Sequence, residues 1–364
     1  MVQAPRPLAF QVGGHGGIVV SQDGSLVIKP CLPNEPKFYQ TVQSEPSLAP
    51  LKDIIPAYYI DTGNDSIVGV HRARGRTESD DESNLHCPGL AITLENLTHG
   101  FKHPNVIDIK LGTIIHDEFA SPEKRARSEK KARAQTSWET GLTLTGFSLY
   151  NPSTDAIAIT RREDLRKLKA AELPRAIQLC FPTATQTGPC PSSKSQSHSK
   201  TQEFIDLSAP PRASGLPPSL LHEVIRKICD ETKHIRNVLA NSEISLTGAS
   251  LFIVYETDWE ACRQGLEYTL PGNITKTSAK AAQSFDDEAD QSVRRSYNAD
   301  RQGACLVKLI DFAHTRYTPE RYVHDGVLMG LDNILNLFEG RIEELEDLDD
   351  DLMDTTKAQS SVLD

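Results

Sequence analysis

One short segment, residues 103–112, constrains this chain most, because its apolar run carries an acid and a base two positions apart. A proline near its start, a glycine at its end and the β-branched residues between them predict an extended strand. Side chains two apart on a strand share one face, so Asp108 and Lys110 should point together. Charges are costly among apolar side chains unless a function uses them, although an ordinary ion pair on a half-exposed strand would give the same pattern.

A second apolar run, residues 305–310, is followed directly by Asp311, Phe312 and Ala313. Protein kinases present a magnesium ligand through a similar Asp-Phe-Gly triplet after a strand. The sequence contains no H-R-D-x-x-x-x-N catalytic loop, so the pattern disfavours an ordinary protein kinase.

Near the N-terminus, a glycine-rich stretch at residues 11–17 precedes two β-branched runs joined around Asp23-Gly24. This order predicts a β-hairpin, with Lys29 at the end of its second strand. A glycine cluster alone is more often a flexible turn, and a strand lysine is more often a surface charge. Kinases nevertheless hold ATP phosphates with this layout, so Lys29 is a candidate phosphate ligand.

Residues 121–134 predict a strongly basic helix, because Ser121-Pro122 is a helix start signal. Three of its six basic residues are spaced to share one face, namely Lys124, Arg127 and Lys131. Converging cations suit a ligand that carries several phosphates. A solvated face, a nuclear import signal and a nucleic-acid patch are the alternatives, and the lack of interleaved aromatic residues weakens the last of these.

The net charge of −11 says little about the ligand, because residues 339–354 hold nine acidic residues against one arginine. Two polar stretches, 182–219 and 272–302, predict disordered insertions. Seven scattered cysteines without a C-x-x-C pair favour free thiols in a reducing compartment. No apolar run is long enough to span a bilayer. We therefore expect a soluble intracellular protein of the cytoplasm, the nucleus or both.

Several motifs occur in the order found in the inositol polyphosphate kinase family, which the chain resembles. They are Leu94-Glu95-Asn96-Leu97-Thr98, Pro104-x-x-x-Asp108-x-Lys110-x-Gly112, Ala249-Ser250-Leu251-Phe252, Asp311-Phe312-Ala313-His314-Thr315 and Asp325-Gly326-x-x-x-Gly330-Leu331. The fourth motif is similar to the multikinase and hexakisphosphate kinase branches of the family. Trisphosphate 3-kinases typically carry Asp-Phe-Gly-Lys-Thr there, so that branch is disfavoured.

The resemblance implies an α+β, kinase-like two-lobed fold with ATP in the cleft between the lobes. The smaller lobe would span residues 1–97, and the larger lobe would span 98–345 and include the basic substrate helix at 121–134. An acidic, disordered tail is expected at 346–364.

For the nucleotide, the resemblance implies one role for each of five residues. Lys29 would hold the phosphates, and backbone groups of Glu95 and Leu97 would bind adenine. Asp311 would hold Mg²⁺, and Ser250 would contact the metal and phosphate end of ATP.

For the acceptor, the resemblance implies that Asp108 lies near the ribose and the attacking hydroxyl, while Lys110 offsets charge on the transferring phosphoryl group. His314 would orient the inositol phosphate together with Lys124, Arg127 and Lys131. Family members often carry an arginine in a G-[FM]-R-[LV] pattern that helps to hold the substrate. Ser148 stands at that position here, which leaves the finer substrate preference open.

These features predict Mg²⁺-assisted, ATP-dependent phosphorylation of inositol trisphosphate to tetrakis- and pentakisphosphate. The multikinase branch is favoured because the chain is compact, whereas hexakisphosphate kinases, which make pyrophosphates, tend to be larger. A non-catalytic scaffold that binds inositol phosphates is an alternative of another class. Phosphoinositide lipids, and a protein at the acidic tail, are further candidate partners, and nucleic-acid binding is not expected.

Overall fold

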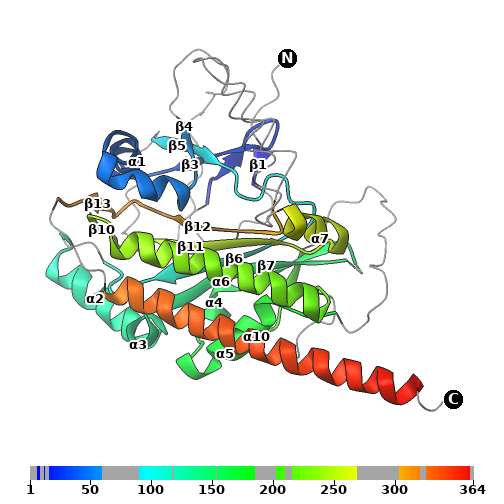
Figure 1. The fold of residues 1–364 in the computed structure, drawn as a ribbon. Helices are drawn as coiled ribbons and strands as arrows, with labels where there is room; N and C mark the ends of the chain where they lie inside the picture. The colour runs from blue at the N-terminus through cyan, green and yellow to red at the C-terminus, as the bar shows by residue number, and fades with distance from the viewer. Residues whose placement is uncertain are drawn as a thin grey trace.

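The computed structural model describes residues 6–8, 12, 16–59, 90–116, 119–152, 154–184, 202–209, 215–268, 303–319 and 325–360. The insertion expected at 272–302 lies outside them. Figure 1 shows a small sheet with helix α1 above a larger sheet, whose face toward the viewer carries two long helices, α6 and α10. Within the described part of the chain, none of the helices combines the length and apolar character needed to cross a membrane.

The smaller sheet has the strand order β1-β2-β3-β5-β4. Its strands are β1 Arg6–Pro7, β2 Val19–Val20, β3 Leu26–Pro30, β4 Tyr58–Tyr59 and β5 Ala91–Glu95. The predicted hairpin is confirmed, since Val19 pairs with Ile28 in an antiparallel register. Helix α1, Asn34–Ser44, and the 3₁₀ helix η1, Pro46–Asp53, follow β3.

The larger sheet has the order β12-β11-β6-β7-β8-β9 and is antiparallel except for the last pair. Its strands are β6 Pro104–Leu111, β7 Leu142–Asn151, β8 Ala156–Thr160, β9 Gln202–Ile205, β11 Ser250–Glu256 and β12 Cys305–Ile310. The short strands β10 Ile244–Ser245 and β13 Arg316–Tyr317 pair separately. Because β6 has neighbours on both sides, its apolar residues lie in the core, as at Ile107 and Ile109.

Helices cover the larger sheet and its ends. They are α2 Pro122–Ala134, α3 Ser137–Thr140, α4 Arg162–Leu165, α5 Leu173–Cys180, α6 Pro218–Ala240, α7 Trp259–Tyr268 and α10 Asp325–Ser360, with a short 3₁₀ turn, η2, at Ala170–Glu172. Apolar residues at helical spacing along α6, such as Val224 and Ile228, are fully buried in the core. Helix α10 lies beside it (Figure 1).

The Asp325-Gly326-x-x-x-Gly330-Leu331 motif serves packing in this structure. A Cβ atom on Gly326 would collide with Thr113, and a Cβ atom on Gly330 would collide with the Gly141 backbone. These glycines therefore let the first turn of α10 approach β6 and β7 closely. The motif fixes the helix against the end of the strand that carries Asp108 and Lys110.

Two expectations of disorder are wrong in part. Residues 202–205, inside the predicted insertion 182–219, form β9 in parallel with β8. The stretch is polar in composition overall, but it contains a short apolar segment in which Ile205 is buried. Residues 346–360, inside the predicted tail, continue helix α10. A helix already nucleated and anchored by buried Leu345 gains a backbone hydrogen bond for each added residue, so acidity alone does not end it.

Candidate active site

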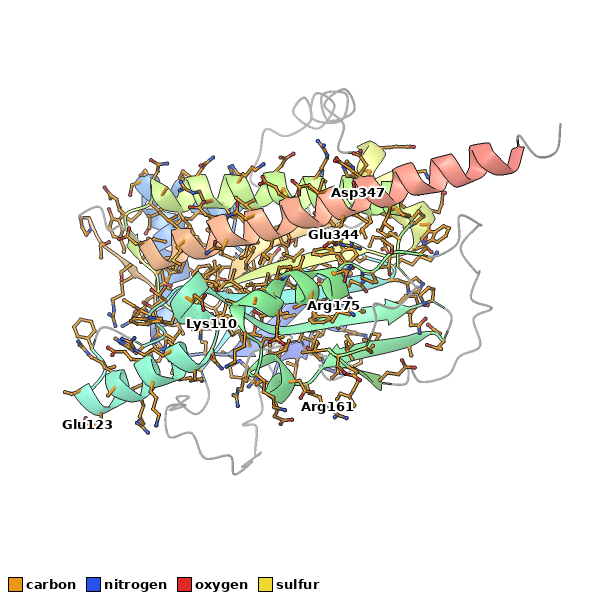
Figure 2. The ribbon with its side chains drawn as sticks, turned by 90° about the horizontal axis from the view of Figure 1, so that it is seen from below. Lys110, Glu123, Arg161, Arg175, Glu344 and Asp347 are labelled. Carbon is orange, nitrogen blue, oxygen red and sulfur yellow. The ribbon has the colours of Figure 1, made fainter. Side chains whose placement is uncertain are left out.

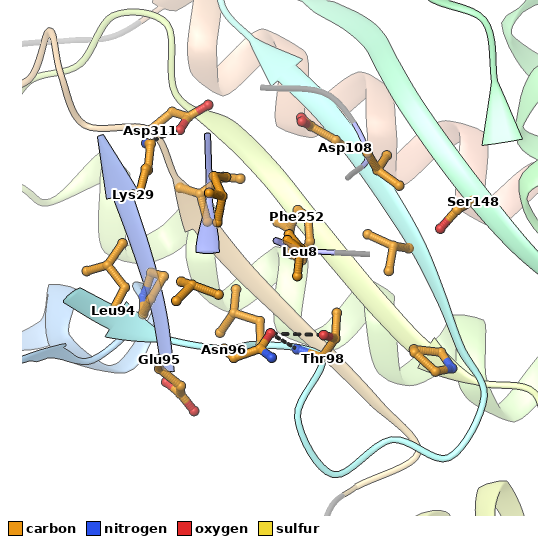
Figure 3. Close-up of a pocket in the computed structure, with 18 of the residues that line it drawn as sticks. Leu8, Lys29, Leu94, Glu95, Asn96, Thr98, Asp108, Ser148, Phe252 and Asp311 are labelled. Carbon is orange, nitrogen blue, oxygen red and sulfur yellow. Dashed lines mark hydrogen bonds and ion pairs between the residues drawn. The ribbon is translucent and has the colours of Figure 1, made fainter. Parts of the chain in front are cut away.

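A cleft lies between the two sheets. It encloses about 1100 Å³, including its open mouth, and its walls are largely apolar. Figure 3 shows Lys29, Asp108 and Asp311 toward one end of the cleft, and Asn96 and Thr98 toward the other. An apolar slot that ends in converging charges suits a ligand with a flat apolar part and an anionic part.

Lys29 on β3 faces two carboxylates. Its Nζ atom lies 2.9 Å from Glu35 Oε1 on α1, and it also bonds Asp311 at the end of β12. Burial lowers the pKa of Lys29, but the two carboxylates outweigh this effect and hold its pKa above the ordinary value. The ammonium therefore stays charged and links the smaller lobe to the larger one.

Asp311 is held in a left-handed backbone conformation, with φ +69°. Residues other than glycine rarely adopt this conformation, so the surrounding contacts must enforce it. The next residue, Phe312, is 1% exposed and stacks on Phe38 of α1 with ring centroids 4.7 Å apart. This aromatic contact fixes the chain immediately after Asp311 and keeps its carboxylate at the cleft.

Asp108 is buried on β6, at an irregularity in the sheet. The pairing of β6 with β7 shifts after Asp108, and the extra β7 residue, Thr145, donates its hydroxyl to the Asp108 carbonyl at 2.8 Å. Among the described residues, Asp108 Oδ1 has no hydrogen-bond partner. Burial, together with the negative charge of Asp311, raises the pKa of Asp108 to about 6. This carboxyl group is therefore poised to exchange a proton near neutral pH.

Lys110 is two residues after Asp108 on β6 and is opposite Ser250 on β11. Burial lowers the pKa of Lys110, while the charges of Asp311 and Asp108 act in the other direction. The two β6 side chains therefore share a face, as the alternation predicted. Ser250 is itself opposite Ile310, the residue before Asp311, so three neighbouring strands bring these groups together.

The segment after β5 forms the other end of the cleft. The Glu95 N–H donates to the Ala57 carbonyl, and the Asn96 N–H donates to Ser25. Asn96 Oδ1 also accepts hydrogen bonds from Thr98 (Figure 3). Among the described residues, no group is bonded to the Leu97 N–H. A ligand in the cleft can therefore use this backbone donor.

The basic helix begins as predicted, with the Ser121 hydroxyl accepting a bond from the Lys124 N–H at 3.3 Å. Figure 2 shows Glu123 at the outer end of α2 and Lys110 inward of it. The positive charge of Lys131, near the inner end, acts on Lys110. Lys124 is half-buried, whereas Arg127 and Lys131 are exposed.

His314 follows Asp311 on the loop between β12 and β13 and is half-buried. The loop turns back on itself through a bond from the Thr315 N–H to the Phe312 carbonyl, 3.1 Å long. His314 is thus three residues beyond Asp311 on a chain whose preceding part is fixed by packing.

The described residues hold no group of three or more His, Cys, Asp or Glu side chains that could bind a metal alone. Asp311 with the Ser250 hydroxyl nearby is a partial set of oxygen ligands. Mg²⁺ usually binds through one or two carboxylates plus substrate phosphates, so this set fits a metal that arrives with a nucleotide.

Comparison with known proteins identifies the family. The model of the family described as inositol polyphosphate kinase matches residues 91–208 and 214–339. The chain belongs to the inositol polyphosphate kinase family. The matched residues include β6, α2, β11 and the Asp311 segment, whereas β3 with Lys29 lies before the matched range.

Relatives in the inositol polyphosphate kinase family match this chain over different lengths. The inositol polyphosphate multikinase of Saccharomyces cerevisiae is 23% identical over 92% of this chain and 97% of its own length. The Schizosaccharomyces pombe multikinase is 32% identical over 38% of this chain and 49% of its own. Mouse inositol hexakisphosphate kinase 2 is 24% identical over 68% of this chain and 48% of its own length.

A solved structure of the S. cerevisiae inositol phosphate multikinase, in complex with ADP and Mn²⁺, has the same fold. Its TM-score is 0.55 at 22% identity, over 88% of this chain and all of that chain. The kinase-like α+β fold predicted from the motifs is confirmed. As a member of this family, the protein is an ATP-dependent inositol polyphosphate kinase.

Ser148 lies on β7 opposite Val106 and lines the cleft. The irregularity at Thr145 precedes the motif, and Gly146, Phe147 and Ser148 pair with β6 in continuous register. The position at which family members often carry an arginine is therefore part of the cleft wall.

Sequence reasoning missed two charged residues of the site. Glu35 pairs with Lys29, and its position six residues after a strand lysine, at the start of a helix, was the available signal. Arg162, at the start of α4, acts electrostatically on Lys110 together with Lys131. Arg162 lies far from the motifs in the sequence, and only the sheet brings it to this place.

Proposed function

We propose that the protein is a multikinase that phosphorylates inositol trisphosphate in steps to tetrakis- and pentakisphosphate. One observation carries this proposal. The negative charge of Asp311, in the cleft, and the positive charges of Lys131 and Arg162 all act on the ammonium of Lys110. A phosphate donor and a polyanionic acceptor would therefore meet at Lys110.

Lys29 would bind the ATP phosphates. It is charged, sits at the cleft, and bonds two carboxylates, which phosphate oxygens can replace or join. Adenine would occupy the apolar end, where the Leu97 N–H can donate to it and Glu95 contributes its backbone. The apolar walls would exclude water from this part of the nucleotide.

Asp311 would hold the magnesium ion, with the Ser250 hydroxyl at the metal and phosphate end. When bound, the metal supplies positive charge that neutralises the phosphates during transfer. The left-handed backbone at Asp311 and the stacking of Phe312 keep this ligand in place before the nucleotide arrives. This preorganisation would spare the reaction part of its ordering cost.

Asp108 would lie near the ribose and the attacking hydroxyl. With its pKa raised to about 6, its carboxylate is a stronger base than an ordinary aspartate and can accept a proton from that hydroxyl. Lys110, buried beside it, would offset the charge on the phosphoryl group in transit. The strand that carries both is anchored on each side, which holds their spacing.

The inositol phosphate would bind between α2 and the loop after Asp311. Lys131 and Lys110 would contact its phosphates directly, with His314 on the other side. Lys124 and Arg127 would complete the cationic face of α2. Arg162 adds a further cation near Lys110. Several converging cations favour a ring with several phosphates over a single phosphate.

An inositol hexakisphosphate kinase is the second candidate, because the mouse enzyme of that branch matches 68% of this chain. The S. cerevisiae multikinase matches almost its whole length, which favours the first candidate. Phosphoinositide lipids are candidate additional acceptors, and a protein is a candidate partner of the acidic end of α10. The five described cysteines are free and buried, which supports a reducing compartment, the cytoplasm or the nucleus.

The decisive test is turnover by the purified protein with Mg²⁺-ATP. Inositol trisphosphate, inositol hexakisphosphate and phosphoinositide vesicles are supplied separately, and products are resolved by charge. Conversion of the trisphosphate to tetrakis- and pentakisphosphate is the expected result. Turnover of the hexakisphosphate alone would move the protein to the other branch. Binding of inositol phosphate without any turnover would favour a non-catalytic scaffold.

A further inference from the structure

The start of helix α1 grips the loop that carries His314. Asn34 Nδ2 donates one hydrogen bond to the Ala313 carbonyl at 3.2 Å and a second to the Thr315 carbonyl at 2.7 Å. These two carbonyls stand immediately before and after His314. One side chain of the smaller lobe thus holds both flanks of a histidine in the larger lobe.

The next residues of α1 hold an earlier part of the same segment. Glu35 bonds Lys29 and also accepts a hydrogen bond from the Phe312 backbone. Phe38, one turn later, stacks on Phe312. These contacts fix the nucleotide end of the segment, whereas the amide of Asn34 reaches beyond them to the residues around His314.

The bonds made by Asn34 are specific in direction. Both acceptors are carbonyl oxygens, and an amide nitrogen has two hydrogens, so Asn34 can serve both of them at once. The bonds are partly buried, which limits competition from water. A side chain that only accepts hydrogen bonds would face two oxygens of like partial charge at this place.

We propose that Asn34 is a positioning residue, which sets the place of His314 against the inositol phosphate by holding the backbone on either side of it. This inference rests on the proposed function, in which His314 contacts the acceptor. It makes the smaller lobe, otherwise devoted to the nucleotide, part of the acceptor site. A shift of about 1 Å in such a contact is enough to weaken productive binding.

Two substitutions separate positioning from folding. Asn34→Ala removes both hydrogen bonds. Asn34→Asp keeps the size of the side chain but removes its donors, and an acid in the first turn of a helix tends to stabilise that helix. A positioning role therefore predicts that Asn34→Asp impairs acceptor binding while KM for ATP stays nearly unchanged.

The matched control is Thr41→Ala on the same helix. It removes a side-chain bond to the Lys37 carbonyl within α1 and leaves the His314 loop untouched. We would measure KM for inositol trisphosphate, KM for ATP and the melting temperature in all variants. Equilibrium binding of inositol trisphosphate without nucleotide gives an independent readout.

We expect both Asn34 variants to raise KM and Kd for inositol trisphosphate by about 5- to 50-fold, with KM for ATP changed by less than about 2-fold. Unchanged acceptor binding in an active enzyme would overturn the inference and leave the proposed function standing. Equal rises in both KM values with a lowered melting temperature would also overturn it, in favour of a structural role. If the unsubstituted protein does not turn over inositol trisphosphate, the proposed function itself fails.

Discussion

Lys29 Nζ and Glu35 Oε1 lie 2.9 Å apart, which joins strand β3 to helix α1 directly behind the cleft. The same ammonium bonds Asp311 of the larger lobe. Glu35 is 2% exposed, and burial raises its pKa against the opposing effect of Lys29. Burying the charge of Glu35 therefore costs desolvation energy. This cost is expected where the position of Lys29 matters for function.

Glu35→Gln tests that role. The glutamine keeps the volume and removes a buried charge, so we expect the melting temperature to stay within a few degrees. Lys29 would lose one of the two carboxylates that fix its ammonium, and kcat/KM for ATP should fall by about 10- to 100-fold. Steady-state kinetics beside thermal unfolding check both parts. Glu45→Gln, at the far end of α1, is the control, and an unchanged kcat/KM in Glu35→Gln would contradict the assignment.

Asp311→Asn should remove turnover and leave the fold intact. Asparagine tolerates the left-handed φ of +69° better than most residues, so the backbone has no reason to move. It is a weaker metal ligand than a carboxylate, and we expect kcat to fall by at least about 100-fold. Titration of Mn²⁺ with ADP by calorimetry would show the loss of metal-dependent binding. Asp332→Asn, which breaks only the surface pair with Arg236, is the matched control. Activity with the ordinary metal dependence would rule out the metal role.

Asp108 should govern the acid side of the pH profile. Because its pKa is about 6, kcat should fall as the pH is lowered through about 6 and the carboxylate takes up a proton. A profile that stays flat down to pH 5 would show that the charged form is not required. Asp108→Asn should abolish the transition together with most of the activity.

The Asp108 carboxyl group should affect folding stability with the opposite pH dependence, because lowering the pH lowers kcat but stabilises the fold. Its folded-state pKa is raised above the ordinary value of 3.8, so its charge destabilises the protein above pH 6, and the penalty disappears as the pH falls toward 4. Asp108→Asn should therefore be more stable than the parent at pH 7.5, by about 2 to 3 kcal/mol, and by less than about 1 kcal/mol near pH 4. Urea unfolding at both pH values measures this difference.

Lys131→Ala should weaken acceptor binding. Its charge acts on Lys110, so its removal should raise KM for inositol trisphosphate by about 10-fold or more and leave KM for ATP nearly unchanged. Lys130→Ala is the control, because this neighbour is equally exposed and removes the same charge from the same helix but points from another side. Similar effects of the two substitutions would contradict a direct contact of Lys131 with the acceptor and would indicate that α2 attracts it only through its overall positive charge.

Much of the site could be read from the sequence because its chemistry is local. Asp108 and Lys110 share a face through strand alternation alone, Lys29 follows a hairpin recognisable by its turn, and Ser121-Pro122 starts a helix by its own capping chemistry. Asp311 ends an apolar strand, so its exposure at a sheet edge follows from pattern. For each of these, the physical cause lies within a few residues, and the family resemblance adds the order.

The remainder was decided by tertiary structure. The bond of Lys29 to Asp311, the approach of Arg162 to Lys110, and the hydrogen bonds of Asn34 to the His314 loop all join segments that are far apart in the chain. The strand irregularity at Thr145, whose hydroxyl bonds the Asp108 carbonyl, follows from no spacing rule. The pKa of Asp108 depends on burial between two strands, so it exists only once the sheet has formed. Local sequence specified which groups are present, and packing determined which of them meet and how strongly they hold their charge.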